Sequence, residues 1–462
     1  MKLQDTLSNL EQEVDVSNKI RIYLCGVTVY DESHIGHART IIVFDVLRKY
    51  LESKGVEIEF VQNFTDVDDK IINRANTENT TAEKISTKYI DNYFDDFDRL
   101  NVKRATNYPK ATEHIDDIIK FIEKLIEKNI AYTSKNGVYF EVTKFPEYGK
   151  LSKKKIEDLQ SGSRIEIDES KNNPLDFAVW KLSDVEPVWD SPWGKGRPGW
   201  HIECSAMSVK YLGENFDIHG GGRDLIFPHH ENEIAQSEAC TNTQFAKIWM
   251  HVGMVTISGE KMSKSLGNTK SIKHVLENWG PNIIRLFCLS GHYSKVIDYS
   301  EEMLKENITK WRQAETCYYE LIHANNENDV DIEKNVLKIG TEFDDALDDD
   351  FNTHLALSAF FQVVKEGNRL AAEEKLGKTD AKIIKNEFDR MLKILGLNIP
   401  KITETEKQEI DNLIISREQF RKEKQFDKAD EIRDKINEMN IELIDHKGKT
   451  TWMKKENIKS EN

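Results

Sequence analysis

Two short segments of the chain carry side chains that could act on a phosphate group. The first, His34-Ile35-Gly36-His37, stands where an expected strand meets an expected helix. The N-terminus of a helix attracts anions, imidazoles can donate hydrogen bonds to phosphate oxygens, and a glycine lets a flat base approach the backbone. Taken alone, the two histidines are equally compatible with surface positions at a helix start.

The second segment is a lysine-containing loop, Glu260 to Asn268 (EKMSKSLGN), which follows the expected strand HVGMVTI. Lys261 and Lys264 flank a Met-Ser pair and glycines stand on either side, so the loop is expected to be mobile. Lysine acts in such a loop as a flexible point charge that could clamp a triphosphate. By itself, a loop of this composition is usually solvated surface.

The elements around the first segment predict a parallel α/β sheet. The run IRIYLCGV after Lys19 reads as a buried strand, residues 36–54 have helical spacing and meet Gly55, and VEIEFVQNF reads as another strand. Strand, helix and strand in this order form a βαβ unit, whose right-handed crossover places both strands parallel in one sheet.

Further along, the pattern changes several times. Residues 82–129 are expected to be helical, KNGVYFEV to be a strand entered through a turn at Asn136-Gly137, and residues 148–198 to be an insertion with loops. FDIHGGG is expected to be a strand that ends in a glycine loop. Beyond Pro281 nearly everything is expected to be helical, with a linker near Pro400.

The composition is that of a globular protein that does not coat nucleic acid generally. There are 65 Lys and Arg against 81 Asp and Glu, a net charge of −16, which favours solubility. The five cysteines are scattered, so a disulfide framework is not expected. No run is apolar enough for a signal peptide or a membrane span, which indicates a cytoplasmic protein.

Four residues have side chains that zinc accepts as ligands: Cys25, Cys204, His229 and Glu233. His229 and Glu233 are four apart and share a helix face, whereas His230 is expected to point about 100° away. No compact ligand spacing accompanies them, and lone cysteines are most often buried apolar residues. On the residues alone, both interpretations stay open.

The two phosphate segments, in this order and each beside a strand, resemble the HIGH and KMSKS signatures of class I aminoacyl-tRNA synthetases. Strings between and around them resemble cysteinyl-tRNA synthetases in particular, over nearly the whole chain. These strings are YLCGVTVYDESHIGHAR, NFTDVDDKIINRA, DFAVWK, GRPGWHIECSAMS, DIHGGGRDLIFPHHENEIAQSEA, GEKMSKSLGN and DDDFNT.

The resemblance implies a Rossmann-type parallel-sheet catalytic domain with an insertion, followed by helical domains. It implies that ATP and L-cysteine form cysteinyl-adenylate and that cysteine passes to the 3′ end of tRNA(Cys). His34, His37, Lys261 and Lys264 would be catalytic, Gly36 and Lys264 would contact ATP with Mg²⁺ on the phosphates, and Asp224 would hold a ribose hydroxyl, although an aspartate there could equally cap a helix. One Zn²⁺ on Cys25, Cys204, His229 and Glu233 would bind the substrate thiolate, and Trp200, otherwise an ordinary core residue, would line the substrate pocket.

The family also suggests a domain plan and a monomer. The catalytic domain is expected in two halves, residues 1–115 and 199–300, around a connective insertion at 116–198, with a helical bundle at 301–400 and an anticodon-binding domain at 401–462. This tail holds 14 Lys and Arg against 15 Asp and Glu, a higher density of basic groups than the rest of the chain. Trp452 could stack on an unpaired base there, and Asp430, Arg433 and Asp445 are candidate contacts.

Two other functions fit parts of the sequence. A cysteine ligase that transfers cysteine to a small amine would need the catalytic half, but neither the helical region nor the tail. A non-catalytic RNA-binding relative would not need intact HIGH and KMSKS segments together with all four ligand positions.

Overall fold

The computed structural model describes the whole chain except residues 156–169, 263–266, 328–329, 401, 447–448 and 462. The chain divides into two compact units. The first consists of Met1–Ile272, Gly291–Asp298 and Asp348–Phe351, and the second of Lys273–Ser290, Tyr299–Leu347 and Asn352–Asn462. The finer five-part division stays a prediction.

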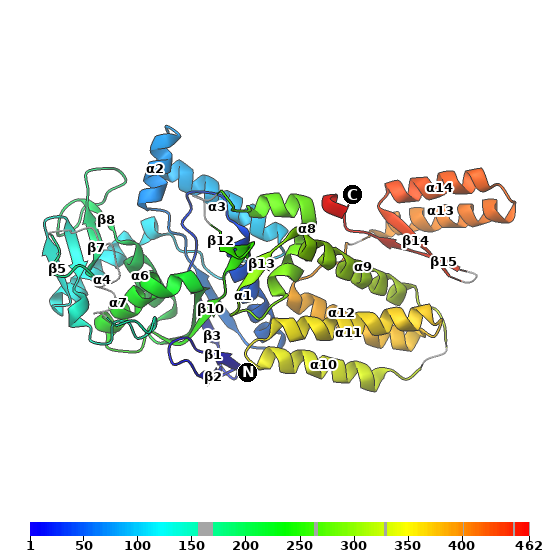
Figure 1. Ribbon diagram of the computed structural model, residues 1–462, viewed down its shortest axis with the longest axis horizontal. Helices are drawn as coiled ribbons and strands as arrows, with labels where there is room; N and C mark the ends of the chain where they lie inside the picture. Colours follow the sequence, from blue (N-terminus) through cyan, green and yellow to red (C-terminus); the bar gives the residue numbers. More distant parts are fainter. Residues whose placement is uncertain (156–169, 263–266, 328–329, 401, 447–448, 462) are drawn as a thin grey trace. The chain divides into compact units, whose positions relative to one another are not determined.

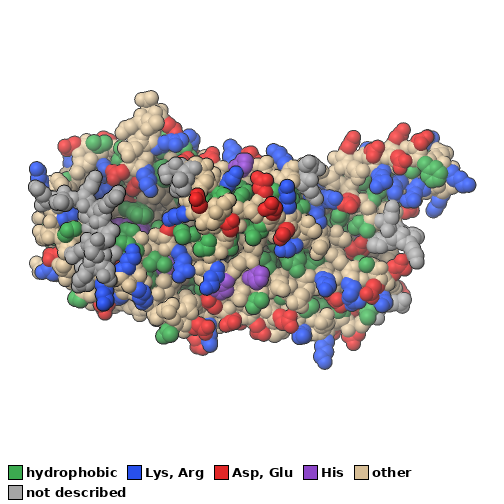
Figure 2. Space-filling model, in the orientation of Figure 1, with side chains coloured by type: hydrophobic (Ala, Val, Ile, Leu, Met, Phe, Trp, Pro, Cys, Tyr) green, Lys and Arg blue, Asp and Glu red, His purple; other side chains and the backbone are tan. Residues whose placement is uncertain are grey.

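The surface and the helices agree with the composition. Acidic and basic side chains are intermixed over the face seen in Figure 2. Within the described ranges, no helix combines the length and the apolar character needed to cross a membrane.

A parallel sheet forms the centre of the first unit (Figure 1). In the described part of the chain its strand order is β10-β9-β3-β4. The strands are β3 (Ile20–Leu24), β4 (Ile58–Gln62), β9 (Phe216–Gly222) and β10 (Ala246–Val252). All three pairings are parallel, and Leu24 of β3 stands opposite Gly220 of β9. Helix α1 (Ile35–Ser53) connects β3 to β4, which confirms the predicted βαβ unit.

Between β4 and the insertion the chain is helical, but in separate pieces. These are α2 (Asp69–Thr77), α3 (Ala82–Arg99), the short turn η1 (Ala111–His114) and α4 (Ile115–Glu127). The continuous helix expected over residues 82–129 is therefore interrupted between α3 and α4. Asn101, with φ of 56°, is a left-handed residue just after the end of α3, a conformation that stops a helix.

The insertion contains an antiparallel sheet rather than loops alone. Its strands, in spatial order, are β5 (Ala131–Ser134), β6 (Gly137–Phe140), β7 (Phe177–Leu182) and β8 (Gly196–Pro198). The strand predicted from KNGVYFEV is β6, while the loop prediction is wrong for β7 and β8. The reason is that β7 pairs with β6 on one side and with β8 on the other, and this pairing buries Trp180 completely.

The site elements of the first unit follow the insertion. Helix α6 (Trp200–Leu212) precedes β9, and the turns η3 (Arg223–Leu225) and η4 (Ile226–His230) lead from β9 into α7 (Glu231–Thr241). The expected strand HVGMVTI is divided at Gly253 between β10 and β11 (Val255–Ile257). Gly253 donates its N–H to the carbonyl of Tyr293, and β11 pairs instead with β12 (Glu260–Lys261) and β13 (Ile297–Tyr299). The hairpin β1 (Lys2–Gln4) and β2 (Glu11–Glu13) and the turn η2 (Val142–Lys144) complete this unit.

The second unit is mostly helical, as predicted. Its helices are α8 (Ile272–Leu289), α9 (Glu301–His323), α10 (Glu333–Asp348), α11 (Thr353–Ala372), α12 (Lys378–Leu395), α13 (Glu404–Lys422) and α14 (Phe426–Glu438). Helix α8 bends at Gly280-Pro281, where Gly280 has a φ of 75°. The tail departs from the all-helical expectation, because it ends in a hairpin of β14 (Ile441–His446) and β15 (Lys449–Lys454), followed by η6 (Lys459–Glu461).

One acidic side chain of the second unit, Glu456 after β15, is partly buried. The carboxylate of Glu456 accepts a hydrogen bond from Asn282 Nδ2 at 2.7 Å. Its backbone N–H donates to Glu315, and its carbonyl accepts from Arg312. Burial and the charge of Glu315, opposed by Asn282 and Arg312, raise the pKa of Glu456 to about 7.

Candidate functional site

A pocket of about 300 Å³ lies at the carboxyl end of the parallel sheet in the first unit. Open α/β sheets bind ligands at this edge. Its lining brings together the predicted Cys25, His34, Gly36, His37, Trp200, Asp224 and Lys261. The other predicted catalytic lysine, Lys264, lies outside the described residues.

The N-terminus of α1 forms one wall of this pocket. His34 is the cap residue, and its Nδ1 accepts a hydrogen bond from the N–H of Gly36 at 3.1 Å. The Nδ1 of His37 accepts from the N–H of His34 at 3.3 Å, and the two rings stack with centroids 3.7 Å apart. Because both Nδ1 atoms accept, each neutral ring carries its proton on Nε2. Both imidazole rings therefore lie at the positive end of the helix, where an anion is favoured.

Close packing favours glycine at position 36. A Cβ atom at this position would lie 3.0 Å from the ring of His34 and 3.3 Å from the methyl group of Met262. The glycine thus lets the first turn of α1 approach the strand segment that carries Lys261.

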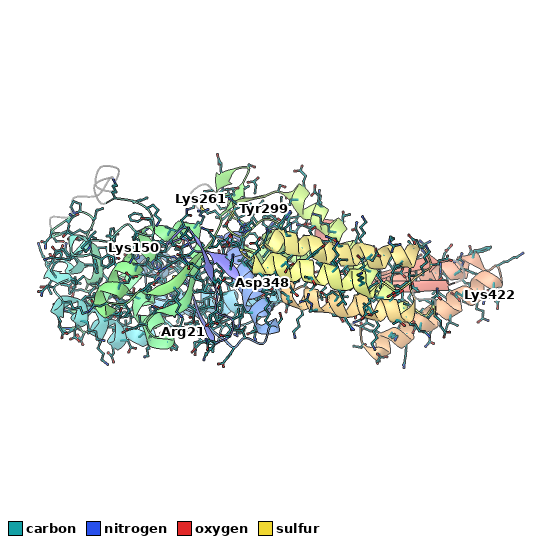
Figure 3. The ribbon with its side chains drawn as sticks, turned by 90° about the horizontal axis from the view of Figure 1, so that it is seen from below. Arg21, Lys150, Lys261, Tyr299, Asp348 and Lys422 are labelled. Carbon is teal, nitrogen blue, oxygen red and sulfur yellow. The ribbon has the colours of Figure 1, made fainter. Side chains whose placement is uncertain are left out.

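Lys261 and Asp224 reach the pocket from a strand and a turn, respectively. Lys261 ends β12 (Figure 3), and its Nζ lies 3.8 Å from a carboxylate oxygen of Asp224 in η3. Both side chains are more than half exposed. Since Asp224 occurs just after the glycines of β9, it is placed at the mouth of the pocket with its carboxylate available to a ligand hydroxyl.

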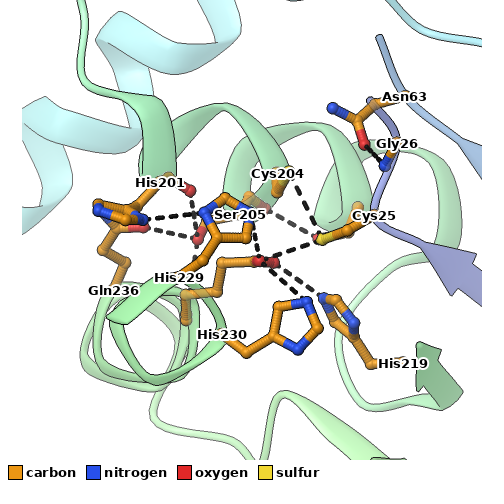
Figure 4. Close-up of polar contacts among 12 residues, drawn as sticks. Cys25, Gly26, Asn63, His201, Cys204, Ser205, His219, His229, His230 and Gln236 are labelled. Atoms are coloured by element: carbon orange, nitrogen blue, oxygen red, sulfur yellow. Dashed lines mark hydrogen bonds and ion pairs between the residues drawn. The ribbon is translucent and has the colours of Figure 1, made fainter. Parts of the chain in front are cut away.

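A buried cluster of sulfur, nitrogen and oxygen atoms lies next to the pocket (Figure 4). Cys25 follows β3, Cys204 is in α6, His229 is in η4 and Glu233 is in α7. All four side chains are buried, and one ligand atom from each lies within 4.8 Å of every other. Among them only Cys25 also lines the pocket.

The distances within the cluster are short. Cys25 Sγ lies 3.8 Å from Cys204 Sγ and 3.3 Å from Glu233 Oε1, which in turn is 3.0 Å from His229 Nε2. The i, i+4 relationship predicted for His229 and Glu233 is confirmed as a contact. Four donors so arranged could hold a metal ion.

Cys25 is held in place by the residue after it. The N–H of Gly26 donates to Asn63 Oδ1 at 2.8 Å, and a Cβ at this position would lie only 1.6 Å from the backbone oxygen of Asn63. Any other residue would force β3 and the segment after β4 apart, so Gly26 fixes the position of the thiol.

Two further histidines orient the candidate ligands. His201 Nδ1 lies 2.9 Å from His229 Nδ1, and His219 Nε2 lies 2.8 Å from Glu233 Oε2. Metal-binding histidines commonly use their second nitrogen in this way. The sequence analysis missed both residues, although His201 adjoins Trp200 and His219 stands in FDIHGGG.

His230 also faces the cluster, so the expectation that it points away is wrong. Its Nε2 lies 3.9 Å from Glu233 Oε1, and a second donor set within the described residues consists of Cys25, His219, His230 and Glu233. Residues 226–230 form a wide π-turn in which Phe227 leaves the helical conformation. The 100° spacing of an α-helix therefore does not apply there.

The protein alone keeps the cluster partly ionised. The hydrogen bond between Cys204 and Cys25 lowers the pKa of Cys204 to about 6, whereas burial raises the pKa of the Cys25 thiol. Burial opposes charge on Glu233 and His229, but their mutual attraction prevails. The charges of His219 and His229 hold the pKa of Glu233 well below its usual range. The charges of Glu233 and the Cys204 thiolate raise the pKa of His229 to about 10. The site thus already stabilises anionic donors.

Trp200 connects the cluster to the pocket. It lines the pocket, and its indole stacks on the ring of His229 at a centroid distance of 4.3 Å. The side chain is thus a wall of the pocket and also a cover over one candidate metal ligand. The remaining cysteines, Cys240, Cys288 and Cys317, are buried outside this cluster.

The helix that carries Glu233 is tied to the insertion. Glu231, fully buried, accepts backbone hydrogen bonds from Gly149, Leu151 and Ser152. The next residue, Asn232, accepts a hydrogen bond from the hydroxyl of Tyr148 at 2.5 Å. The start of α7 therefore rests on contacts with residues 148–152.

The candidate RNA-contacting residues lie in the tail of the second unit. Trp452 is only 2% exposed, contacts His323 and Tyr319, and donates its indole N–H to Asp411. The expectation that it stacks on a base is therefore wrong. Asp430 and Arg433 are exposed on α14, and of Asp445 the structure describes the backbone, in β14.

An exposed aromatic side chain exists in the tail at another position. Phe426 begins α14 and is 60% exposed. With Asp430 and Arg433 it follows the i, i+4, i+7 spacing of one helix face. The sequence signal for it was an aromatic residue at the polar start of an amphipathic helix.

Comparison with known families assigns most of the chain. Residues 11–309 match the family described as tRNA synthetases class I (C) catalytic domain, and residues 342–399 match the DALR domain.

Curated relatives match along the entire length. A protein of Thermodesulfovibrio yellowstonii named cysteine–tRNA ligase is 49% identical over 99% of this chain and 100% of its own. One of Thermococcus kodakarensis with the same name is 47% identical over 98% of both chains.

Solved structures share the fold at low sequence identity. Methionyl-tRNA synthetase of Mycobacterium tuberculosis with methionyl-adenylate has a TM-score of 0.62 at 13% identity, covering 82% of this chain and 89% of its own. LeuRS of Agrobacterium radiobacter in a ternary complex with tRNA and LeuAMS has a TM-score of 0.63 at 10% identity, covering 82% and 84%.

Proposed function

The chain belongs to the cysteine–tRNA ligase family of class I tRNA synthetases, and we propose that it activates L-cysteine with ATP and transfers it to the 3′ end of tRNA(Cys). The observation that carries this proposal is the junction at Cys25, which lines the nucleotide-sized pocket and also belongs to the buried Cys204–His229–Glu233 cluster. This arrangement places the thiol of the amino acid at the cluster and its carboxylate beside side chains that can bind phosphate.

In the first step the carboxylate of cysteine attacks the α-phosphorus of ATP, and the bond to pyrophosphate breaks. The Nε2–H groups of His34 and His37 donate to the α-phosphate as negative charge develops on it. Lys261 holds the departing pyrophosphate together with Lys264, and Mg²⁺ bound to the phosphates would supply further positive charge there. Asp224 accepts a hydrogen bond from a ribose hydroxyl.

In the second step a hydroxyl at the 3′ end of the tRNA attacks the carbonyl carbon of the adenylate, and AMP leaves. Neither step needs a covalent bond to the protein. The chain's contribution is to position the reactants and to stabilise charge.

The cluster fits one zinc ion. Zn²⁺ binds thiolate at about 2.3 Å, so two sulfurs on a tetrahedral ion lie about 3.8 Å apart, the same as the separation of Cys25 and Cys204. Cys25, Cys204, His229 and Glu233 are the proposed ligands, with His201 and His219 orienting them. Such an ion favours a thiolate over a serine hydroxyl, because sulfur is the softer ligand and ionises far more readily.

The tail is the proposed anticodon-binding part. Phe426 offers an exposed ring for stacking on an unpaired base, and Asp430 and Arg433 stand on the same face to contact base edges or phosphates. Asp445 remains a candidate contact. We also propose that the enzyme acts as a monomer in the cytoplasm.

ATP–pyrophosphate exchange that depends on cysteine, measured together with charging of tRNA(Cys), tests the function. We expect both activities, with serine inactive in exchange. Exchange without charging would indicate a ligase that uses a small acceptor, and the absence of both would exclude catalysis.

A further inference from the structure

A groove of about 900 Å³ lies between α9 and α11, wholly within the second unit. One wall is the 307, 310, 313 face of α9, and the other is the 354, 357, 361, 365, 368 face of α11, both at helical spacing. His354 Nδ1 bonds the carbonyl of Ser290 at one end, and Asn368 donates to the carbonyl of Gln313 at the other. These two hydrogen bonds fix both ends of the α11 wall.

An amide in the groove has no partner. Asn307 is 3% exposed, lines the groove, and its Nδ2 makes no hydrogen bond within the described residues. Leaving a buried donor unpaired costs stability, and such exceptions in native proteins are few. A ligand with an acceptor atom accounts for this donor, whereas an apolar occupant does not.

The charged groups of the groove are all basic. Lys310 on α9 and Lys365 on α11 are exposed on opposite walls, and among the described residues neither is paired with a carboxylate. Arg369 also lines the groove but is paired with Glu366 and Glu373. In a chain of net charge −16, a groove lined by two available lysines and no acidic side chain indicates a polyanionic partner.

The floor of the groove is apolar. Leu357 and Leu286 are buried there, and Phe361 is half-buried beside them. A flat base or a ribose can pack on such a floor, while flanking phosphates meet cations on the rims. An acidic peptide would use the lysines but would not explain the apolar floor between them.

The groove continues into a second hollow. Gln313 and Asn368 line both, and the second hollow adds Arg312. Arg312 in turn lines a third hollow together with Arg433 and Lys455 of the tail, but Glu442 and Glu456 line it as well, and Arg312 and Lys455 are paired with Glu315 and Glu442. The two lysines available to a phosphate therefore lie in the groove itself.

We propose that the groove between α9 and α11 binds a nucleotide of the tRNA, with Lys310 and Lys365 on its phosphates and Asn307 donating to the base or ribose. The proposal rests on tRNA being the substrate. It adds a contact site in the helical part of the chain, apart from the α14 face.

The test is tRNA binding as a function of salt. The double variant Lys310→Gln/Lys365→Gln is expected to raise the Kd for tRNA(Cys) roughly tenfold at 0.15 M salt. It should also make the slope of log Kd against log salt shallower by about 1.4, from about 0.7 for each phosphate contact in a single strand. Lys338→Gln on α10, where Lys338 is paired with Glu342, is the matched control and should change neither quantity.

A second variant separates binding from folding. Asn307→Leu removes the unpaired donor while nearly preserving volume, so its melting temperature should equal or exceed that of the wild type while tRNA binding weakens severalfold. Cysteine-dependent pyrophosphate exchange should stay unchanged in all these variants. If both groove variants keep the wild-type Kd and salt slope, the proposal is overturned. If the wild-type protein itself shows no cysteine-dependent pyrophosphate exchange, the proposed function is refuted instead.

Discussion

The Sγ atoms of Cys25 and Cys204 lie 3.8 Å apart although 179 residues separate them in the chain. The contact exists because β3 and β9 are parallel neighbours, and because the first turns of α6 approach the carboxyl end of β3. Most of the proposed chemistry depends on this meeting point.

Removal of a thiol from this pair should remove the metal. In Cys204→Ala we expect zinc measured by mass spectrometry to fall from about one per chain to near zero. The KM for cysteine should rise more than about 100-fold, because loss of a residue that only hydrogen-bonds to a metal ligand already costs about 10- to 100-fold. Cys240→Ala, which deletes a buried cysteine outside the cluster, is the control and should retain zinc.

Selection against serine should weaken when the metal is removed from the enzyme. A preference of 10⁴ corresponds to about 5.5 kcal/mol, which a pocket wall alone does not provide for side chains of such similar shape. Exchange assays with cysteine and serine on the chelated, still folded enzyme measure this preference. If the preference stays intact without metal, the ion is structural and the account of specificity is wrong.

Lys261→Ala should slow adenylate formation without weakening cysteine binding. Its ammonium group lies at the mouth of the pocket beside Asp224, and the loss of one charged donor at a transition state costs about 100-fold or more in kcat. Pyrophosphate exchange and cysteine binding by calorimetry check this result. Lys247→Ala in β10, which removes a surface ion pair with Asp217 of β9, should leave both unchanged.

Phe426 and Trp452 of the tail should behave oppositely. Phe426→Ala should leave the melting temperature nearly unchanged but weaken tRNA binding by about 1–3 kcal/mol, the usual value for one stacked base. Trp452→Ala should instead destabilise the second unit by about 3–5 kcal/mol, since a buried tryptophan is lost. Weaker tRNA binding by a fully stable Trp452→Ala protein would contradict this assignment.

The stability of the second unit should depend on pH through Glu456. Its folded pKa is about 7, above the ordinary glutamate value of about 4.3, so the folded state binds the proton more tightly. The contribution is complete below about pH 4 and is lost as pH rises through 7, by roughly 3 kcal/mol from this group alone. Urea unfolding at pH 5.5 and 8 should show this loss in the wild type and a much smaller one in Glu456→Gln, which stays neutral and keeps an acceptor for Asn282.

Much of the catalytic half could be predicted from local patterns. The βαβ unit and the position of His34 and His37 at a helix start follow from apolar spacing within about 45 residues. The strand β8 is only three residues long and contains a glycine and a proline, so no local pattern predicts it. The run FAVWKL of β7 does carry a strand pattern, but its pairing with β6 joins segments about 40 residues apart.

The cluster was predictable only in part, for a similar reason. Residue types and the resemblance identified the four candidate ligands, but His201 and His219 meet them only through folding. His230 was misjudged because a π-turn replaced the regular helix. The burial of Trp452 depends on Tyr319 and His323, more than 120 residues earlier, and no local pattern contains that information.

The carboxylate of Glu231 has a consequence for how such an enzyme could be shortened. It binds three backbone N–H groups of residues 149–152, two positions before Glu233. Excision of the insertion would leave this buried anion without donors and displace the start of α7. A minimal version of the enzyme, whether reached by deletion in evolution or in the laboratory, must therefore keep residues 148–152 or replace Glu231 at the same time.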